Sequence, residues 1–345
     1  MRIAIVTDIW EPQVNSLVNT VKATVQCLRS SGHEVKIVEP AGLPMFSLHS
    51  FPEIRLAGKP YRRVERELDA FAPDAIHILT EGTMGLAARR YCLARGLDFT
   101  SSCNAGLPGV LHARTRIPVA AGFLWLSWFH RHSRSVMVFS QSDMHALRKR
   151  GVHNVVLWGR GIDTARFQPE RTDYACIQRP LHLFVGRLSA DHGVVDFLRL
   201  DVPGSKWVIG DGPLREELEQ RYPQVKFLGQ KENRDLPPYY NCADVLVYPG
   251  KADTLFLSLL EAMACGIPVA TYAAEGANEV VANGVSGALD KDLASAVRAA
   301  LALDRGKVRQ HALAFSSDLA ASRFLENLCP ARLVPIDAAP NSSIV

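Results

Sequence analysis

The stretch from Ala243 to Ala270 reads ADVLVYPGKADTLFLSLLEAMACGIPVA. Its first part, Val245–Tyr248, is rich in β-branched residues, and its middle part, Leu257–Cys265, is apolar and long enough for a helix. A second short apolar run, Pro268–Thr271, follows. Two short apolar runs joined by a helix are typical of a β-α-β unit, whose strands lie parallel in one sheet. The stretch therefore predicts an α/β fold with parallel sheets covered by helices.

The same alternation of strand and helix patterns runs along both halves of the chain. In the first half we expect strands at Arg2–Thr7, Glu34–Val38, Ala75–Ile78 and Ser135–Phe139, and helices at Val14–Ser30, Arg63–Phe71, Gly85–Arg95 and Ser142–Arg150. In the second half we expect further strands at Leu181–Val185, Lys206–Ile209 and Val225–Leu228, and helices at Val194–Leu200, Leu214–Tyr222, Leu236–Cys242 and Leu293–Leu303.

A polar, proline-flanked stretch near Phe167 separates the two halves. We therefore expect two doubly wound, Rossmann-like domains that face each other across a cleft. The first is expected over residues 1–163, a linker over 164–179, and the second domain over 180–307. A helix over residues 308–330 is expected to cross back to the first domain, before a tail at 331–345. Ligands of such sheets bind at the carboxyl ends of the strands.

The overall composition excludes some classes of protein. A formal net charge of +4 over 345 residues is too small for a nucleic-acid-binding protein, but suits an anionic substrate or an anionic membrane surface. The seven cysteines show no metal-ligand spacing, which favours reduced thiols in a cytoplasmic protein. The chain opens on a strand and contains no apolar run of membrane-spanning length, so we expect at most peripheral contact with the inner face of a membrane.

Two carboxylates, Asp253 and Glu261, stand eight positions apart on either side of an apolar run. On one interpretation, Asp253 or Thr254 caps the following helix and Glu261 lies at a solvated edge. On the other, both acids bind hydroxyl groups of a ligand that rests on the helix N-terminus. These residues alone leave both interpretations open.

Three loops between a strand and a helix have residues that suit phosphate. The Gly186-Arg187 pair would place a guanidinium at the sheet edge, where it binds either a diphosphate or a neighbouring acid. The run from Gly210 to Pro213 allows close backbone approach to a ligand, or is simply a tight turn. The stretch from Tyr248 to Lys251 leads into a helix N-terminus, which attracts anions.

Taken together, VGRLS, IGDGPLREEL, ADVLVYPGKADT…LLEAMACGIPVA and RGID at Arg160–Asp163 resemble the retaining, metal-independent glycosyltransferases of family 4, which have the GT-B fold. In the first half, MRIAIVTDIWEPQVN and PDAIHILTEGTMGLAARRYCLARG are similar to the acceptor domain of that family. The resemblance covers about residues 1–328. It is closest to GDP-mannose-dependent α-mannosyltransferases and to glycolipid-forming glucosyl- and sulfoquinovosyl-transferases.

The resemblance implies retaining transfer of a hexose from a nucleoside-diphosphate sugar, GDP-mannose first and UDP-glucose second, to a lipid or glycan acceptor without a metal or other cofactor. Arg187, His192 and Asp253 are the implied catalytic residues. Arg187 would offset charge on the leaving diphosphate. The implied donor-binding residues are Gly186, Arg187, Gly210, Asp211, Gly212, Pro213, Thr254, Leu255, Phe256, Leu257 and Glu261, of which Glu261 would hold the ribose. The implied acceptor-side residues are Asn15, Ser16, Glu81, Asn104 and Arg160.

The chain departs from the family pattern at four places. Asp191-His192 replaces the usual Glu-Lys, Asn15-Ser16-Leu17 replaces Asn-Gly-Val, and Leu255-Phe256 replaces Phe-Gly. Asn104 and Gly106 stand where the family has His and Arg. These departures support a second hypothesis, a pseudoenzyme that keeps the fold and binds a nucleotide or a partner. An oxidoreductase is a third and weaker hypothesis. The first strand is followed by TDIWEPQ and not by the GxGxxG motif that binds dinucleotide cofactors.

The stretch Arg114–Arg134, RTRIPVAAGFLWLSWFHRHSR, combines arginines with Trp125, Trp128 and Phe129. It suits either a membrane interface that delivers a lipid acceptor or a core helix with basic ends. His130 and His132 are badly aligned for a shared ligand, so we expect both to be solvated.

Overall fold

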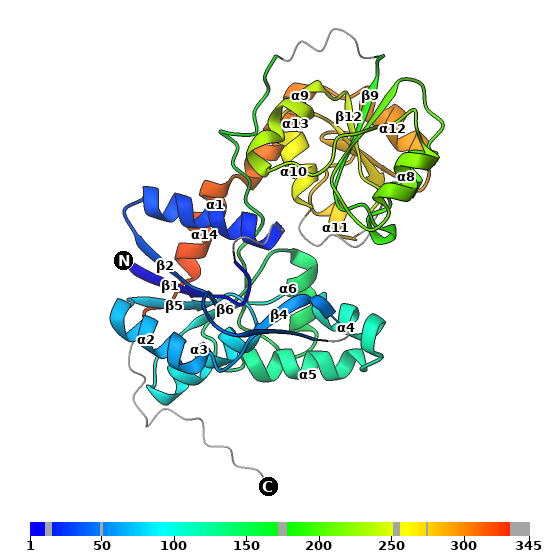
Figure 1. The fold of residues 1–345 in the computed structure, drawn as a ribbon. Coiled ribbons are helices and arrows are strands. Elements are labelled where there is room, and N and C mark those ends of the chain that lie inside the picture. The colour runs from blue at the N-terminus through cyan, green and yellow to red at the C-terminus, as the bar shows by residue number, and fades with distance from the viewer. Residues whose placement is uncertain (11–15, 49–50, 172–177, 251–255, 274, 332–345) are drawn as a thin grey trace. The chain divides into compact units, whose positions relative to one another are not determined.

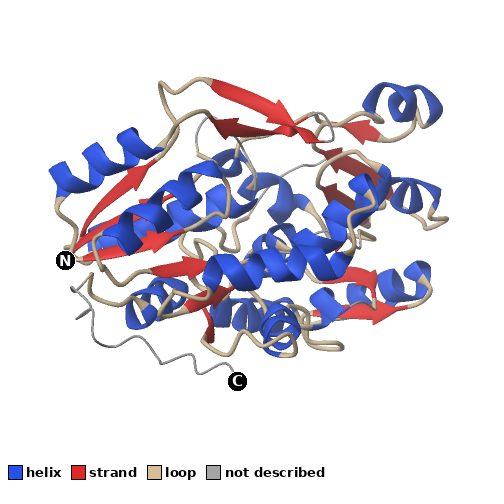
Figure 2. Ribbon diagram, turned by 90° about the horizontal axis from the view of Figure 1, so that it is seen from below, coloured by secondary structure: helices blue, strands red, loops and turns tan. Residues whose placement is uncertain are grey.

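The computed structural model describes residues 1–10, 16–48, 51–171, 178–250, 256–273 and 275–331 (Figure 1). The chain forms two compact units. The first unit is Met1–Gly159 joined by the chain from Ala320 onward, and the second unit is Arg160–Leu319. Both units consist of a parallel sheet with helices packed on it, and Figure 2 shows the strands lying between helices.

The first unit contains a six-stranded parallel sheet in the order β2-β1-β5-β6-β7-β8. The strands are β1 (Arg2–Val6), β2 (Glu34–Val38), β5 (Ala75–Ile78), β6 (Thr100–Ser102), β7 (Val136–Val138) and β8 (Val155–Leu157). The four strands expected in this half are confirmed to within one residue at each end. The short strands β6 and β8 were not expected, since three residues carry too little pattern to stand out.

The helices of the first unit are α1 (Ser16–Ser30), α2 (Tyr61–Phe71), α3 (Thr83–Ala94), α4 (Leu107–Thr115), α5 (Val119–His130) and α6 (Gln141–Arg148). The four expected helices are present, with ends that differ by up to two residues where the structure describes them. An antiparallel hairpin of β3 (Met45–Leu48) and β4 (Phe51–Ala57) stands apart from the sheet and was missed. Pro52 and the charged residues of β4 hide its strand pattern.

Alternate residues of β1 and β5 face opposite sides of the first sheet. Ala4, Val6, Ile76 and Ile78 belong to one buried cluster that also contains apolar residues of α2 and α3. Period-two alternation is expected of strands, and apolar residues on both faces are expected of a parallel sheet between two helix layers. The carboxyl ends of these two central strands are thereby fixed at one edge of the unit.

His77 faces the opposite side of β5, in a fully buried aromatic cluster. Its ring lies 4.9 Å from the ring of Phe324 and 5.8 Å from Trp158, between ring centroids. Its two ring nitrogens bond to Thr100 Oγ1 at 2.9 Å and Ser102 Oγ at 2.7 Å. Phe324 belongs to α14 (Ser317–Asn327), so the end of the chain returns to the first unit through this cluster.

The second unit has its own six-stranded parallel sheet, in the order β11-β10-β9-β12-β13-β14. The strands are β9 (Leu181–Val185), β10 (Ser205–Ile209), β11 (Lys226–Phe227), β12 (Val245–Val247), β13 (Val269–Tyr272) and β14 (Gly287–Asp290). All five expected strands are confirmed. Strand β14 was missed, because a four-residue edge strand that contains glycine and aspartate gives a weak signal.

The helices of the second unit are α7 (Val194–Arg199), α8 (Arg215–Arg221), α9 (Pro237–Cys242), α10 (Leu257–Ala264), α11 (Glu275–Asn278), α12 (Leu293–Leu301) and α13 (Arg305–Ala312), with short 3₁₀ turns η1 (Ala190–His192), η2 (Asn233–Asp235) and η3 (Leu313–Phe315). The five expected helices are confirmed. The expectation of one helix over residues 308–330 is wrong. Helices α13 and α14 are separate, because the chain between them pairs with Ile162, whose N–H donates to Phe315 O at 3.0 Å.

The expected linker at residues 164–179 begins inside the second unit. Phe167 is only 2% exposed, and its ring packs 5.9 Å from that of Tyr240, between centroids. The guanidinium of Arg309 donates to the carbonyl oxygen of Thr164 at 2.8 Å and also to that of Phe167. The boundary between the units falls at Gly159–Arg160, so residues 164–171 are an anchored part of the second unit.

None of the helices in the described ranges has both the length and the apolar character needed to cross a membrane. No disulfide joins the cysteines of the described residues.

The buried His77 makes the stability of the protein depend on pH. Burial lowers the pKa of His77 from 6.5 to about 3, so the unfolded chain binds one more proton between these two values. The stabilisation from neutral His77 is present above pH 6.5 and is lost as the pH falls toward 3, by at most about 1.4 kcal/mol per pH unit. Urea unfolding at pH 7, 6 and 5 measures this slope.

The variant His77→Gln keeps a hydrogen-bonding side chain and is expected to flatten this slope. His153→Gln changes an exposed histidine of the same unit and is expected to keep the slope of the wild type. A wild-type slope in His77→Gln would contradict this account of His77.

Candidate functional site

The strand order of the second unit directs attention to one edge of its sheet. Strand β9 lies between β10, which follows it in the sequence, and β12, which comes later. This is the topological switch point of a doubly wound sheet, where ligands bind beyond the carboxyl ends of the strands. The loops that follow β9, β10 and β12 are those in which the sequence predicted donor-binding residues.

The loops after β9 and β10 are joined by backbone hydrogen bonds. Gly186 N donates to Ile209 O at 3.0 Å, Leu188 N to Asp211 O at 2.9 Å, and Leu214 N to Leu188 O at 3.1 Å. A Cβ atom on Gly210 would lie 1.9 Å from Gly186 O, and the residue has a φ of +140°. Glycine is therefore needed at Gly210 because the backbone of the neighbouring loop lies so close, whether or not a ligand binds there.

A Cβ atom on Gly212 would likewise lie 2.5 Å from Leu188 O. Asp211 is exposed and accepts hydrogen bonds from Gly212 N at 2.8 Å and Arg215 Nη1 at 3.0 Å. These bonds, that of Gly212 first, lower the pKa of Asp211. Pro213 is exposed and lies in the turn before α8.

Arg187 is the first charged residue beyond β9. Its side chain is exposed, and within the described part of the chain its guanidinium has neither a hydrogen-bond acceptor nor an ion-pair partner. The alternative interpretation, a salt bridge to a neighbouring acid, has no support among these residues. A fully charged group with all its donors available lies at the switch point.

His192 is positioned by Ser189 and Asp191. Ser189 Oγ donates its only proton to Asp191 Oδ1. In the hydrogen bond of 3.0 Å between Ser189 Oγ and His192 Nδ1, the nitrogen must therefore be the donor. Nδ1 therefore carries a proton, and Nε2 is a bare acceptor in the neutral ring and a donor only in the cation. The hydrogen bond from Ser189 is the main cause that lowers the pKa of Asp191.

Glu261 lies on α10 and is only 5% exposed. Its Oε1 accepts from Asn233 Nδ2 at 2.7 Å, and its Oε2 accepts from Tyr240 Oη at 2.8 Å. Burial, with the nearby carboxylate, raises the pKa of Tyr240 well above its usual value. Of the two interpretations of Glu261, the one that places it at a solvated edge is wrong for the side chain. Asn233 and Tyr240 were missed, because only the folded chain brings them to Glu261.

Phe256 precedes α10 in a left-handed conformation, with a φ of +50°. Its ring is buried beside Tyr248, 6.3 Å away between centroids, and near the Arg160 guanidinium, which lies 6.0 Å from the ring centroid. A left-handed backbone favours glycine, which the family pattern has at this position. Phe256 therefore occupies a position with a conformational cost.

Arg160 was expected with the acceptor-side residues but lies in the second unit. Its buried guanidinium lies 3.7 Å from Glu279 Oε2 in an ion pair. Glu279 was not anticipated from the sequence. Four further predicted residues, Asn15, Asp253, Thr254 and Leu255, lie outside the described residues, and Ser16 is described only as the first residue of α1.

The switch point of the first unit lies between β1 and β5, and a buried carboxyl group holds it together. Asp8 accepts from Thr80 Oγ1 at 2.7 Å and, at the start of α3, from Met84 N at 2.8 Å. Burial raises the pKa of Asp8 in spite of these bonds. The sequence carried a weak signal for this role, an acid directly after the first strand.

Glu81, Cys103 and His130 meet at the carboxyl edge of the first sheet. One ligand atom from each lies within 4.8 Å of the others, and His130 Nε2 is 3.3 Å from Glu81 Oε1. His130 is fully buried, so the expectation of a solvated side chain is wrong, whereas His132 is exposed as expected. Burial, with Glu81 nearby, raises the pKa of the Cys103 thiol well above its usual value.

Asn104, expected on the acceptor side, has a local structural role. Its Oδ1 accepts from Gly106 N at 3.0 Å, in a turn that leads into α4. Its side chain is exposed at the same edge as Glu81, so an acceptor contact at Asn104 remains a prediction.

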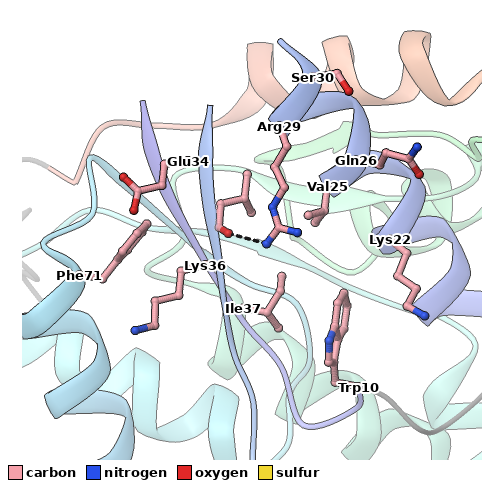
Figure 3. Close-up of a pocket in the computed structure, with 11 residues that line it drawn as sticks. Trp10, Lys22, Val25, Gln26, Arg29, Ser30, Glu34, Lys36, Ile37 and Phe71 are labelled. Carbon is pink, nitrogen blue, oxygen red and sulfur yellow. Dashed lines mark hydrogen bonds between the residues drawn. The ribbon is translucent and has the colours of Figure 1, made fainter. Parts of the chain in front are cut away.

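A pocket of about 870 Å³ runs along β2, the edge strand of the first sheet (Figure 3). Lys22, Arg29 and Lys36 are among its lining residues. Arg29 donates to Val35 O at 2.8 Å, and Lys36 pairs with Glu67 at 2.6 Å. Since Arg29 and Lys36 bond to the protein itself and the pocket lies beside an edge strand instead of beyond the strand ends, this pocket is a weaker candidate for an anionic ligand.

Comparison with known proteins divides the chain in the same way. Residues 17–166 match the family described as Glycosyltransferase Family 4, and residues 179–303 match the family described as Glycosyl transferases group 1. Two similar proteins are GDP-mannose-dependent alpha-mannosyltransferases. The one from Mycobacterium tuberculosis is 28% identical over 81% of each chain, and the one from Mycolicibacterium smegmatis is 29% identical over 82% of each chain.

Solved structures share the fold at low sequence identity. Sucrose-phosphate synthase from Thermosynechococcus elongatus has a TM-score of 0.75 and 19% identity, over 94% of this chain and 97% of that one. Anabaena HepE in complex with UDP and glucose has a TM-score of 0.67 and 15% identity, over 94% and 98%. These matches confirm the predicted GT-B fold.

A substitution at Gly210 tests whether its backbone lies as close to the Gly186 carbonyl as the structure shows. Gly210→Ala would force a methyl group against Gly186 O and is expected to destabilise the second unit by about 2–5 kcal/mol. Urea unfolding followed by circular dichroism measures the change. Pro213→Ala alters an exposed residue of the same loop and should change the stability by less than about 1 kcal/mol. Equal effects of the two variants would argue against this contact.

Proposed function

We propose that this chain, which belongs to the GT-B glycosyltransferases with a family 4 domain followed by a group 1 domain, transfers a hexose from a nucleoside-diphosphate sugar to a lipid or glycan acceptor with retention of configuration. GDP-mannose is the first choice of donor. Three relatives named GDP-mannose-dependent alpha-mannosyltransferase, 25–29% identical over about four fifths of the chain, support it. UDP-glucose is the second choice, supported by the neighbour HepE solved with UDP-glucose.

The observation that carries this proposal is the available guanidinium of Arg187 at the switch point of the second sheet. Breaking the bond between the sugar and a diphosphate leaves negative charge on the departing phosphate oxygens. A fixed cation at that place stabilises the charge as it develops, which is the contribution that a divalent metal makes elsewhere. We therefore take the donor reaction to need no metal.

Two further elements support binding of the rest of the donor. Leu257 lies in the first turn of α10, where backbone N–H groups have no partner within the helix and face anions favourably. Glu261, on the same helix, is held in place by Asn233 and Tyr240, and a carboxylate there suits the hydroxyl groups of a ribose. On the acceptor side, Glu81 and Asn104 remain the predicted contacts.

The pseudoenzyme hypothesis is favoured by one observation, the replacement of a permanent cation by His192. With Nδ1 occupied by Ser189, a neutral His192 offers only a lone pair to a phosphate. Active transfer thus requires the imidazolium, which donates through Nε2. A protein that binds the nucleotide without turning over the sugar would be the pseudoenzyme.

The exposed face of α5 supports a lipid acceptor. Leu124 is 72% exposed, and Trp125 and Trp128, each 39% exposed, lie side by side with ring centroids 5.1 Å apart and ring planes tilted by 30°. The opposite face of α5 is buried in the core through Phe123 and Leu126. The buried face supports the interpretation as a core helix, and the exposed face supports the proposal of a membrane interface. Exposed tryptophans with nearby arginines suit the interface of an anionic membrane.

The first prediction concerns the diphosphate. Arg187→Ala is expected to weaken GDP binding roughly 10- to 100-fold, because charge-assisted hydrogen bonds are lost. Calorimetry with GDP and UDP, with and without a chelator, measures the binding, and the chelator should change nothing. Arg199→Ala removes another exposed arginine of the second unit and should bind GDP like the wild type. Loss of binding in neither variant, or in both, would contradict the role of Arg187.

The second prediction concerns His192. If transfer needs a cation at position 192, His192→Lys, which carries a permanent charge, should transfer mannose from GDP-mannose at least as fast as the wild type, and His192→Ala should lower the rate roughly 100-fold or more. A wild-type rate in His192→Ala would show that His192 has another role.

The third prediction concerns the membrane. Replacing Leu124, Trp125 and Trp128 by Gln is expected to reduce sedimentation with vesicles of phosphatidylcholine and phosphatidylglycerol several-fold, since apolar burial is lost. Leu313→Gln changes a residue of the second unit that is 45% exposed and should leave sedimentation unchanged. Sedimentation of the wild type no greater than that of the triple variant would exclude this surface as the membrane contact.

A further inference from the structure

Within the ranges that the structure describes, one group of His, Cys, Asp or Glu side chains is close enough together to hold a metal ion. It consists of Glu81, Cys103 and His130. They come from three separate places: the loop after β5, the residue after β6, and the last residue of α5. Cys103 and His130 are buried, and Glu81 is partly exposed, with 12% of its side chain accessible. Solvent therefore reaches the group from the Glu81 side only.

A chain of hydroxyl groups determines which nitrogen of His130 carries a proton. Ser133 Oγ donates to the carbonyl oxygen of Ser135 at 2.7 Å, so it must accept from Ser101 Oγ, 2.9 Å away. Ser101 has then used its only proton, and its bond of 2.8 Å to His130 Nδ1 must be donated by the ring. In the neutral ring, Nε2 therefore points a lone pair toward Glu81.

This arrangement leaves acceptors facing one another. His130 Nε2 and Glu81 Oε1 are 3.3 Å apart, and an ionised Glu81 has no proton to offer. The Cys103 sulfur is the third potential ligand within 4.8 Å. The Cys103 thiol is hydrogen-bonded to Glu81, so its proton is the positive group already present, and a metal cation that displaces this proton would meet all three ligand atoms.

We propose that Glu81 Oε1, Cys103 Sγ and His130 Nε2 bind one Zn²⁺ ion. Nitrogen, thiolate sulfur and carboxylate oxygen are the three ligand types of zinc in proteins, and their order of softness favours zinc over magnesium or calcium. Ser101 is the outer partner that fixes the ring of a zinc-bound histidine through its other nitrogen. With three protein ligands, the fourth position takes a water molecule on the exposed side.

Zinc binding balances as an exchange of protons. The ion displaces the thiol proton of Cys103 and any proton shared by His130 and Glu81, and both leave to solvent. Affinity for zinc therefore falls at low pH. This site belongs to the first unit, where Glu81 is also a predicted acceptor contact, and it does not include the residues proposed to bind the donor.

The test is direct metal binding by the full chain. The protein is stripped with a chelator, given Zn²⁺ or Co²⁺, passed through a desalting column and assayed for metal by mass spectrometry. One zinc per chain is expected, and the cobalt form should show the absorption of a cobalt–thiolate bond in the near ultraviolet. Cys103→Ser should abolish that absorption and weaken zinc binding roughly 100-fold or more, and Ser101→Ala should weaken it about 10- to 100-fold.

Cys92→Ser is the matched control, because Cys92 is a buried thiol of the same unit that lies outside the group. It should bind zinc like the wild type. If Cys103→Ser does not fold, judged by circular dichroism, Ser101→Ala and the cobalt spectrum of the wild type decide. Zinc retention far below one equivalent, a cobalt form without thiolate absorption, or equal affinity in Ser101→Ala and the wild type would overturn the proposal and leave a shared proton in its place.

Discussion

The contact between the backbone of Gly210 and the carbonyl of Gly186 is the constraint on which the arrangement of the second unit's edge depends. Hydrogen bonds between the two loops hold their backbones together, and a side chain at 210 would push them apart. Arg187 follows Gly186 directly, its side chain is exposed, and no partner for its guanidinium is found among the described residues. Exposure to water keeps such a charge stable. The same exposure leaves it available to an anionic ligand.

The two units use charge in different ways at equivalent edges. In the second unit, Arg187 is a cation and His192 is a potential cation. In the first unit, Asp8 is a carboxyl group held by a hydroxyl group and backbone amides, and Glu81 is a carboxyl group beside His130. A nucleoside diphosphate suits the first kind of edge and a hydroxyl-bearing acceptor suits the second, which is the division of labour proposed for the two domains. The departures from the family pattern fall on both edges. They leave the edge of the second unit cationic and that of the first unit acidic.

Much of the fold follows from local pattern, whereas the site follows from it only in part. Ala75–Ile78 and Leu181–Val185 are observed with the predicted bounds, because buried parallel strands are rich in apolar residues, here interrupted only by His77 and His182. Arg187 was found because it directly follows such a strand. The burial of His130 was not predictable, since it depends on Ser101 and Glu81, which are distant in sequence. The same holds for the bonds that Glu261 receives from Asn233 and Tyr240, and for the placement of Arg160 beside Glu279. The break between α13 and α14 was also missed, because Ile162, far away along the chain, causes it.

The central claim is that Arg187 supplies the positive charge against which the diphosphate departs. It is tested most directly by the release of nucleoside diphosphate from a panel of GDP-mannose, UDP-glucose and UDP-galactose, with the wild type and Arg187→Ala compared at equal donor saturation. The account predicts that the wild type turns over one donor, GDP-mannose, and yields an α-linked product by nuclear magnetic resonance. Arg187→Ala should be slower by roughly 100- to 1,000-fold. Equal rates at saturation, or no turnover of any donor by a wild type that binds GDP, would contradict it.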